Sequence, residues 1–133
     1  MKMRSVRLCL VSVSLCVTGF LSGCSTLADA KAGKGTGISQ SYPVAVDRVW
    51  QVLPAAVKLA GIDYVTDNKA EGFALAQRGL TAFSYGENVA IFVDSVQPQV
   101  TKVEVVSKKA LATTIFATDW AKPILDKIAE LIK

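Results

Sequence analysis

Histidine is absent from the 133-residue chain, and cysteine occurs only three times. The absence of histidine removes the commonest metal ligand and the usual general base near neutral pH. Long apolar runs are absent too, since residues 8–21 fall short of the roughly 20 residues that span a bilayer. The 51% of hydrophobic and 20% of charged residues make the chain too apolar for a wholly disordered protein. Its length accommodates one domain.

The N-terminus has the pattern of a secretory signal peptide. Residues 1–7 carry three basic side chains and no acid, and residues 8–21 are uncharged and mostly apolar. Small residues follow, and Leu21-Ser22-Gly23-Cys24 resembles the lipobox of bacterial lipoproteins. In that family the cysteine is diacylated on sulfur, the signal is cut before it, and the new amine is acylated. The resemblance implies a cleaved signal helix, residues 1–23, and a membrane anchor on Cys24.

Ser25, rather than aspartate, follows Cys24. This resembles the signal that sorts such lipoproteins to the outer membrane of Gram-negative bacteria. We therefore expect the mature protein to be lipid-anchored in the outer membrane and to face the periplasm, with the inner membrane as the alternative. Three acyl chains would make the anchor effectively permanent, because each buried methylene contributes about 0.8 kcal/mol.

Cleavage of the signal changes both the charge and the thiol content. It removes three of the 15 basic residues and none of the 11 acidic ones, so the net charge falls from +4 to +1. Cys9 and Cys16 leave with the signal, and Cys24 is committed to lipid. A nearly neutral exported chain is not expected to bind nucleic acid. Without histidine or a free thiol, the sequence predicts no enzyme, no catalytic residue, no metal site and no cofactor.

The segment after the cysteine is rich in glycine and small polar residues and lacks helical or strand periodicity. We expect residues 24–37 to be a lipidated flexible tether that spaces the domain from the bilayer. A phosphate-binding loop at Gly33–Gly37 is the alternative. It is disfavoured because no strand precedes it and the full P-loop spacing is missing.

Residues 38–133 are expected to form the periplasmic domain. Two apolar stripes at helical spacing predict two helices, one ending at Gly61 with a kink at Pro54, and one with Asp119 as its N-cap. The stripes consist of Val46, Val49, Trp50, Leu53, Val57 and Ala60, and of Trp120, Ile124, Ile128 and Leu131.

Short extended runs predict the strands of this domain. They lie at about 38–42, 62–66, 72–78, 88–96 and 100–107, with a turn at Asp67-Asn68 and a hairpin around Pro98. The order predicts an α+β two-layer domain with a mainly antiparallel sheet of four to five strands. Both helices would cover one face of the sheet, with Trp50 and Trp120 in that core, and the other face would be open to solvent.

The domain pattern resembles small bacterial envelope lipoproteins of uncharacterised function. The residues that carry the resemblance are Val49-Trp50, Gly61-Ile62 and the stretch from Asp67 to Gly72. The domain is also distantly similar to the helix-grip domains of BamC, the accessory lipoprotein of the outer-membrane protein assembly machine. Because these are packing positions, the resemblance implies a fold and no functional residue.

The stretch from Gly79 to Gly86 is the candidate partner-binding site. It places Leu80, Phe83 and Tyr85 between two glycines, where two strands are joined. Aromatic side chains are enriched in interface hot spots, so an exposed cluster here would suit a protein partner. The alternative is that these side chains extend the flanking strands and enter the core.

Three weaker patterns accompany this site. Asp63 and Asp67 could form a carboxylate pair for acid–base chemistry or calcium, although a solubilising strand end is the simpler interpretation. Ser107 and Lys109 could form a dyad on one strand face, but a solvated strand end is again simpler. A basic strip, interpreted as lysines that guard a sheet edge, consists of Lys102, Lys108 and Lys109.

These observations favour a non-enzymatic adaptor or accessory lipoprotein that binds an envelope protein. The alternative is a lipoprotein that binds a small ligand, a lipid or peptide, in a groove between helix and sheet. An enzyme that uses carboxylates is the weakest hypothesis. The oligomeric state is not predicted.

Overall fold

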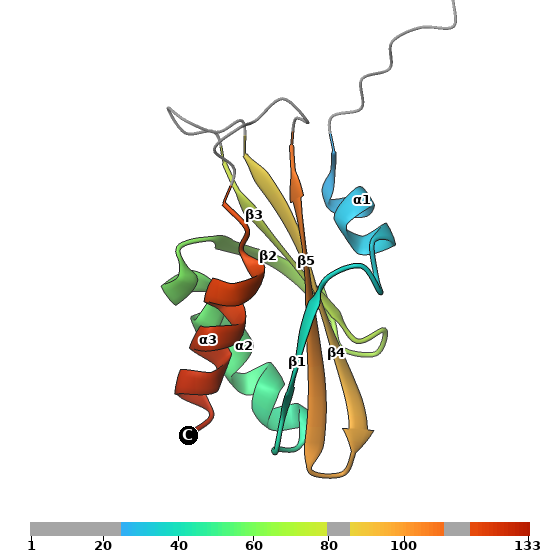
Figure 1. The fold of residues 1–133 in the computed structure, drawn as a ribbon, viewed down its shortest axis with the longest axis vertical. Coiled ribbons are helices and arrows are strands. Elements are labelled where there is room, and N and C mark those ends of the chain that lie inside the picture. Colours follow the sequence, from blue (N-terminus) through green and yellow to red (C-terminus); the bar gives the residue numbers. More distant parts are fainter. Residues whose placement is uncertain (1–24, 80–85, 111–117) are drawn as a thin grey trace, which may run out of the picture.

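The computed structural model describes residues 25–79, 86–110 and 118–133. Within them the chain forms one five-stranded antiparallel sheet and three helices (Figure 1). The predicted α+β class, with both long helices on one face of the sheet, is confirmed. In chain order the elements are α1 (Leu27–Ala32), β1 (Ile38–Tyr42), α2 (Val46–Ala60), β2 (Asp63–Asn68), β3 (Phe73–Arg78), β4 (Glu87–Gln97), β5 (Val100–Lys109) and α3 (Ala121–Leu131).

The strands lie in the order β1-β5-β4-β3-β2. Consecutive strands from β2 to β5 pair as neighbours, whereas β1 pairs with β5 from Ile38 opposite Val105 to Tyr42 opposite Thr101. The β5 strand therefore lies inside the sheet over this stretch. The prediction that the lysines guard a sheet edge is wrong for Lys102, which lies opposite Ser41, because β1 occupies that edge.

Side-chain alternation gives the sheet two different faces. Val89, Ile91 and Val93 of β4 are buried beneath α2 and α3, as the alternation predicts. Ala90 and Phe92 point to the opposite face and are buried as well. That face was expected to be open to solvent, but α1 covers part of it, as Figure 1 shows on the side of the sheet away from α2 and α3.

The main core lies between the sheet and the α2–α3 pair. Both tryptophans are buried in it, at 7% exposure for Trp50 and 4% for Trp120. Helix α2 runs through Pro54 without ending, and Gly61 ends it in the left-handed conformation at φ 96°. The largest fully buried side chains of this layer are Leu53, Ile91, Ile124, Ile128, Val49, Val57, Val89, Val103 and Val105.

Two predicted boundaries differ from the structure. Helix α3 begins at Ala121 with Trp120 at the N-cap position, and the Asp119 carboxylate accepts the Ala121 backbone N–H at 3.0 Å. Asp119 therefore precedes the cap instead of forming it. The strand β2 extends through Asn68, because pairing with β3 continues to the turn closed by Gly72.

Two buried hydroxyl groups join the layers. The Tyr42 hydroxyl donates to the Leu125 carbonyl at 2.8 Å, which connects β1 to α3. Burial, and secondarily the charge of Asp126, raises the pKa of Tyr42, so the phenol remains a donor at neutral pH. The Thr101 hydroxyl donates to the Val44 carbonyl at 2.8 Å and fixes the connection into α2.

The start of β1 depends on close backbone contact with β5. A Cβ atom on Gly37 would lie 2.3 Å from the Val105 carbonyl oxygen, whereas one on Gly79 would meet no described atom within 4 Å. Only glycine therefore allows the chain to pass β5 at this position.

We expect Gly37→Ala to lower the free energy of unfolding by about 1–3 kcal/mol, the usual cost of forced overpacking. Urea unfolding measures this loss. Gly79→Ala is the matched control and should change the unfolding midpoint little. Equal stability of the two variants would contradict the close approach.

Candidate functional site

The first described residue, Ser25, is bonded to the sheet. Its backbone N–H donates to the Ala110 carbonyl at 2.9 Å, and its carbonyl accepts from the Asn88 side-chain amide at 2.7 Å. Its hydroxyl donates to the Lys109 carbonyl. Ser25 therefore sits at one end of the sheet, where β4 begins and β5 ends.

Helix α1 follows directly and is stabilised by a capping box. The Asp29 N–H donates to the Thr26 hydroxyl at 3.3 Å, and the Thr26 N–H donates to the Asp29 carboxylate at 2.6 Å. The bond from the Thr26 backbone, with a further one from the Thr26 hydroxyl, lowers the pKa of Asp29. The carboxylate is therefore charged at neutral pH at the N-terminal end of the helix, where negative charge is favourable.

The buried side of α1 packs on the second face of the sheet. Ala30 is completely buried against Phe73, Ala90, Phe92 and Val106, which form a small apolar cluster. Such a cluster stabilises a helix of six residues that would be marginal in isolation.

Lysines on and after α1 cover the two aromatic rings of this cluster. The Lys31 ammonium lies 3.8 Å from the centre of the Phe73 ring and 3.1 Å from the Glu71 carboxylate. The Lys34 ammonium lies 5.2 Å from the centre of the Phe92 ring. Cation–π contacts at such exposed sites contribute about 0.5–1 kcal/mol each, so they add modestly to the docking.

Glu104 binds the loop between α1 and β1. Its carboxylate oxygen Oε1 accepts the backbone N–H of Gly35 at 2.7 Å and that of Gly37 at 2.9 Å. Glu104 is only 5% exposed, so these bonds replace solvent around a buried acid. The Gly33–Gly37 loop therefore directs these two N–H groups to an acid of the same chain, which further disfavours its interpretation as a phosphate loop.

Residues 25–37, here called the N-terminal segment, are thus docked along their length. The expectation that this part of residues 24–37 is a flexible tether is wrong. The capping residues Thr26 and Asp29 and the buried acid Glu104 were not predicted from the sequence. The available signal was the S/T-x-x-acid spacing at Thr26, which is typical of a helix N-terminus.

The predicted anchor and contact residues lie outside the described residues. Cys24 immediately precedes Ser25, and Leu80, Phe83 and Tyr85 fall between Gly79 and Gly86. Gly86 accepts a bond from the Ala110 N–H, and Ala110 in turn accepts from Ser25. The candidate contact segment therefore ends next to the residue that follows the predicted lipid anchor.

The two candidate carboxylates do not converge. Asp63 is opposite Gln77 on the α1 face, whereas Asp67 is opposite Ala74 on the other face and accepts the Tyr64 hydroxyl at 2.8 Å. Burial, with the Asp67 bond second, raises the pKa of Tyr64. The two carboxylates therefore do not form one pair.

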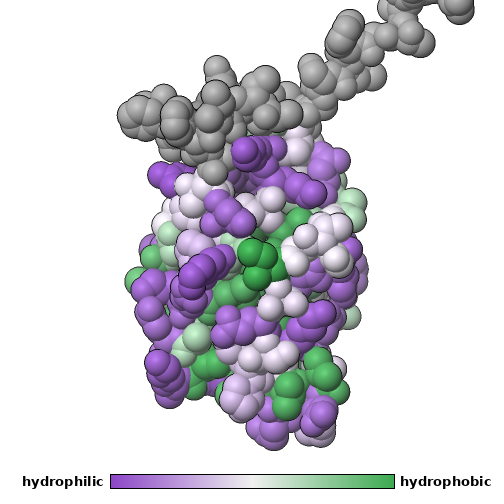
Figure 2. Space-filling view, viewed as in Figure 1, coloured by the Kyte–Doolittle hydropathy of each residue, from purple (hydrophilic) through white to green (hydrophobic). Residues whose placement is uncertain are grey.

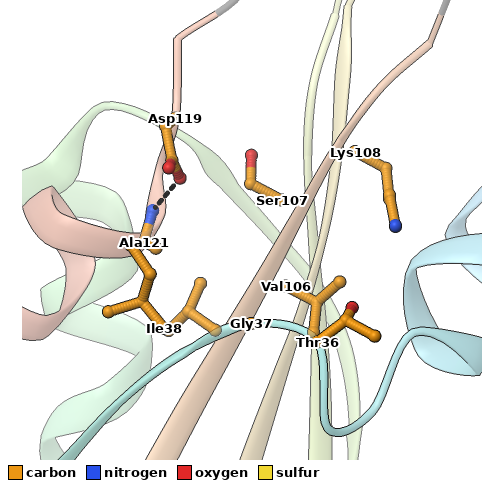
Figure 3. Close-up of a pocket in the computed structure, with 9 residues that line it drawn as sticks. Thr36, Gly37, Ile38, Val106, Ser107, Lys108, Asp119 and Ala121 are labelled. Carbon is orange, nitrogen blue, oxygen red and sulfur yellow. Dashed lines mark hydrogen bonds between the residues drawn. The ribbon is translucent and has the colours of Figure 1, made fainter.

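The Ser107 hydroxyl accepts the Trp120 backbone N–H at 3.4 Å, so it helps to position the start of α3. Ser107 and Lys108 also line a pocket of about 110 Å³ beside β5, with Asp119 and Ala121 across it (Figure 3). This volume is below the roughly 300 Å³ of usual small-molecule sites.

A larger groove, of about 380 Å³, lies between α2 and the sheet. Asp47 and Trp50 line it from the helix, Lys69 and Glu71 from the β2–β3 turn, and Asp94 from β4. This is the place in the described structure that corresponds to the alternative hypothesis of a ligand groove.

The chain matches no protein-family model and no curated protein sequence. In the described part of the chain, no helix combines the length and apolar character needed to cross a membrane. No group of three or more acidic, cysteine or histidine residues within that part is arranged to hold a metal ion.

We expect Glu104→Ala to release the N-terminal segment, because the N–H groups of Gly35 and Gly37 lose a charged acceptor. Bonds to charged groups contribute about 1.5–3 kcal/mol each. Hydrogen exchange of the amides from Ser25 to Gly37 should accelerate strongly, while β4 and β5 stay protected.

The matched control for this variant is Glu71→Ala, which removes an exposed ion pair with Lys31. Such pairs contribute about 0–1 kcal/mol, so exchange in the segment should change little. Unchanged exchange in Glu104→Ala would show that the carboxylate does not hold the segment in place.

Proposed function

We propose that the chain is an envelope lipoprotein, anchored in the outer membrane through acyl chains on Cys24 and facing the periplasm. It acts as a non-enzymatic adaptor or accessory factor that binds an envelope protein. The observation that carries the proposal is the position of Cys24, which follows the export pattern and directly precedes a segment docked on the sheet. A lipid on this residue fixes a folded domain at the membrane instead of leaving it on a long tether.

The partner contact in this proposal is the stretch that includes Leu80, Phe83 and Tyr85. Before this stretch β3 ends at Arg78, and after it β4 begins at Glu87, next to Asn88, which bonds to Ser25. A protein bound there would be held close to the lipid anchor. Large aromatic side chains suit such a contact, because they bury much area with few rotatable bonds.

The alternative function is the binding of a small lipid or peptide in the groove beside α2. Its volume of about 380 Å³ lies within the usual range of ligand pockets, which supports this alternative. The mixture of charged side chains around Trp50 would suit a peptide better than an acyl chain.

For the anchor, Cys24→Ala should abolish fatty-acid labelling and leave the signal uncut, because the thiol that carries the first lipid is lost. Metabolic labelling with an acyl probe and the mass of the product measure both effects. Cys16→Ala is the matched control, since Cys16 lies within the signal and should be dispensable. Normal processing of the Cys24 variant would contradict the anchor.

For the partner, a photo-crosslinking residue in place of Phe83 should capture one specific envelope protein in cells. The same residue in place of Gln99, which is exposed near the β4–β5 turn, is the control and should not capture it. Equal capture from both positions would contradict the proposed contact. Absence of a captured protein, together with a small molecule retained on purification, would favour the ligand-binding alternative.

A further inference from the structure

The position of Ser25 determines how far the domain can lie from its anchor. Consecutive Cα atoms are 3.8 Å apart, so a lipid-bearing Cys24 would lie about one residue from the end of β5. An unstructured chain over residues 25–37 would instead have an r.m.s. length of about 20 Å. This short distance rests on the proposed lipidation of Cys24. Because the segment is docked, no free length of chain separates the lipid from the domain.

The end of the sheet that holds Ser25 carries several cationic side chains. β3 ends at Arg78, and β5 ends with Lys108 and Lys109. The same end also carries described acids: the buried Glu87, the exposed Asp63 opposite Gln77, and the exposed Asp119. The charges at this end are therefore of both signs. In Figure 2 hydrophilic residues are spread over the whole visible face of the described domain.

We propose that this end of the domain, here called the membrane-facing end, lies directly on the lipid surface. The strands then run away from the bilayer, and the turn between β4 and β5 is the most distant part of the sheet. The ten residues of β5 place that turn about 30 Å from the membrane-facing end, at about 3.3 Å per residue. The bonds of Ser25 to Ala110, Lys109 and Asn88 set this orientation.

The lack of other free thiols makes the orientation measurable on the intact lipoprotein. Thr118 and Gln99 are both exposed polar residues, one at the membrane-facing end and one at the far turn. Thr118→Cys and Gln99→Cys each introduce a single reactive thiol into the mature chain for a fluorescent label. The lipidated proteins are reconstituted into vesicles of mixed zwitterionic and anionic phospholipid, with a short-range quencher on some headgroups.

We expect quenching at position 118 to be several-fold stronger than at position 99. Equal quenching at the two positions, or stronger quenching at 99, would overturn the proposal. Insertion of about 12 Gly and Ser residues, beginning with Ser, between Cys24 and Ser25 separates the anchor from the sheet by roughly 20 Å of reach, so the contrast should shrink. An unchanged contrast in this variant would overturn the role of Ser25.

The mass of the N-terminal peptide distinguishes failure of the proposed function from failure of the proposed orientation. A peptide without acyl chains on Cys24 would contradict the proposed function itself. An acylated peptide combined with equal quenching would contradict only the orientation. Unchanged urea midpoints of the two labelled variants show that both report on the folded domain.

Discussion

The Glu104 carboxylate accepts the backbone N–H groups of Gly35 and Gly37 in the N-terminal segment. The covering of the second face of the sheet depends on this interaction. A buried charge is tolerated only when hydrogen bonds replace its lost water. Two glycines supply them. Gly35 has a left-handed backbone at φ 90°, which favours glycine, and the Cβ of any other residue at 37 would collide with β5. One acid and two glycines therefore fix the path by which the chain enters the domain.

Helix α1 exists because of this docking and not because of its own propensity. Its six residues are fewer than an isolated helix needs, so its capping box and the contacts of Ala30 must act together. The sheet face depends on α1 in turn. Phe73, Phe92 and Val106 would lie on an open sheet face if the segment detached, because α1 and the lysines on and after it cover them.

The sequence was sufficient for most of the fold, because local periodicity reports which side of an element is buried. The stripes around Trp50 and Trp120 and the alternation of β4 predicted the main core. The apolar run Val89–Val93 also indicated burial on both faces, a signal that went unused when one face was expected to be solvated. Neither the pairing of β1 with β5 nor the contact of Glu104 with Gly35 could be predicted, since both join residues 59 or more positions apart.

For the proposed lipoprotein, a docked N-terminal segment changes what kind of adaptor the domain can be. A lipoprotein on a long tether samples partners at many distances from the bilayer, and its effective concentration at any one of them is diluted. Ser25 is bonded where β4 begins and β5 ends, so the proposed anchor on Cys24 lies near Gly86, which follows the candidate contact stretch. On the proposed function, a partner must therefore present its binding surface within about one strand length of the membrane. The ordering entropy of the N-terminal segment has already been lost in folding, so binding of a partner does not have to order it.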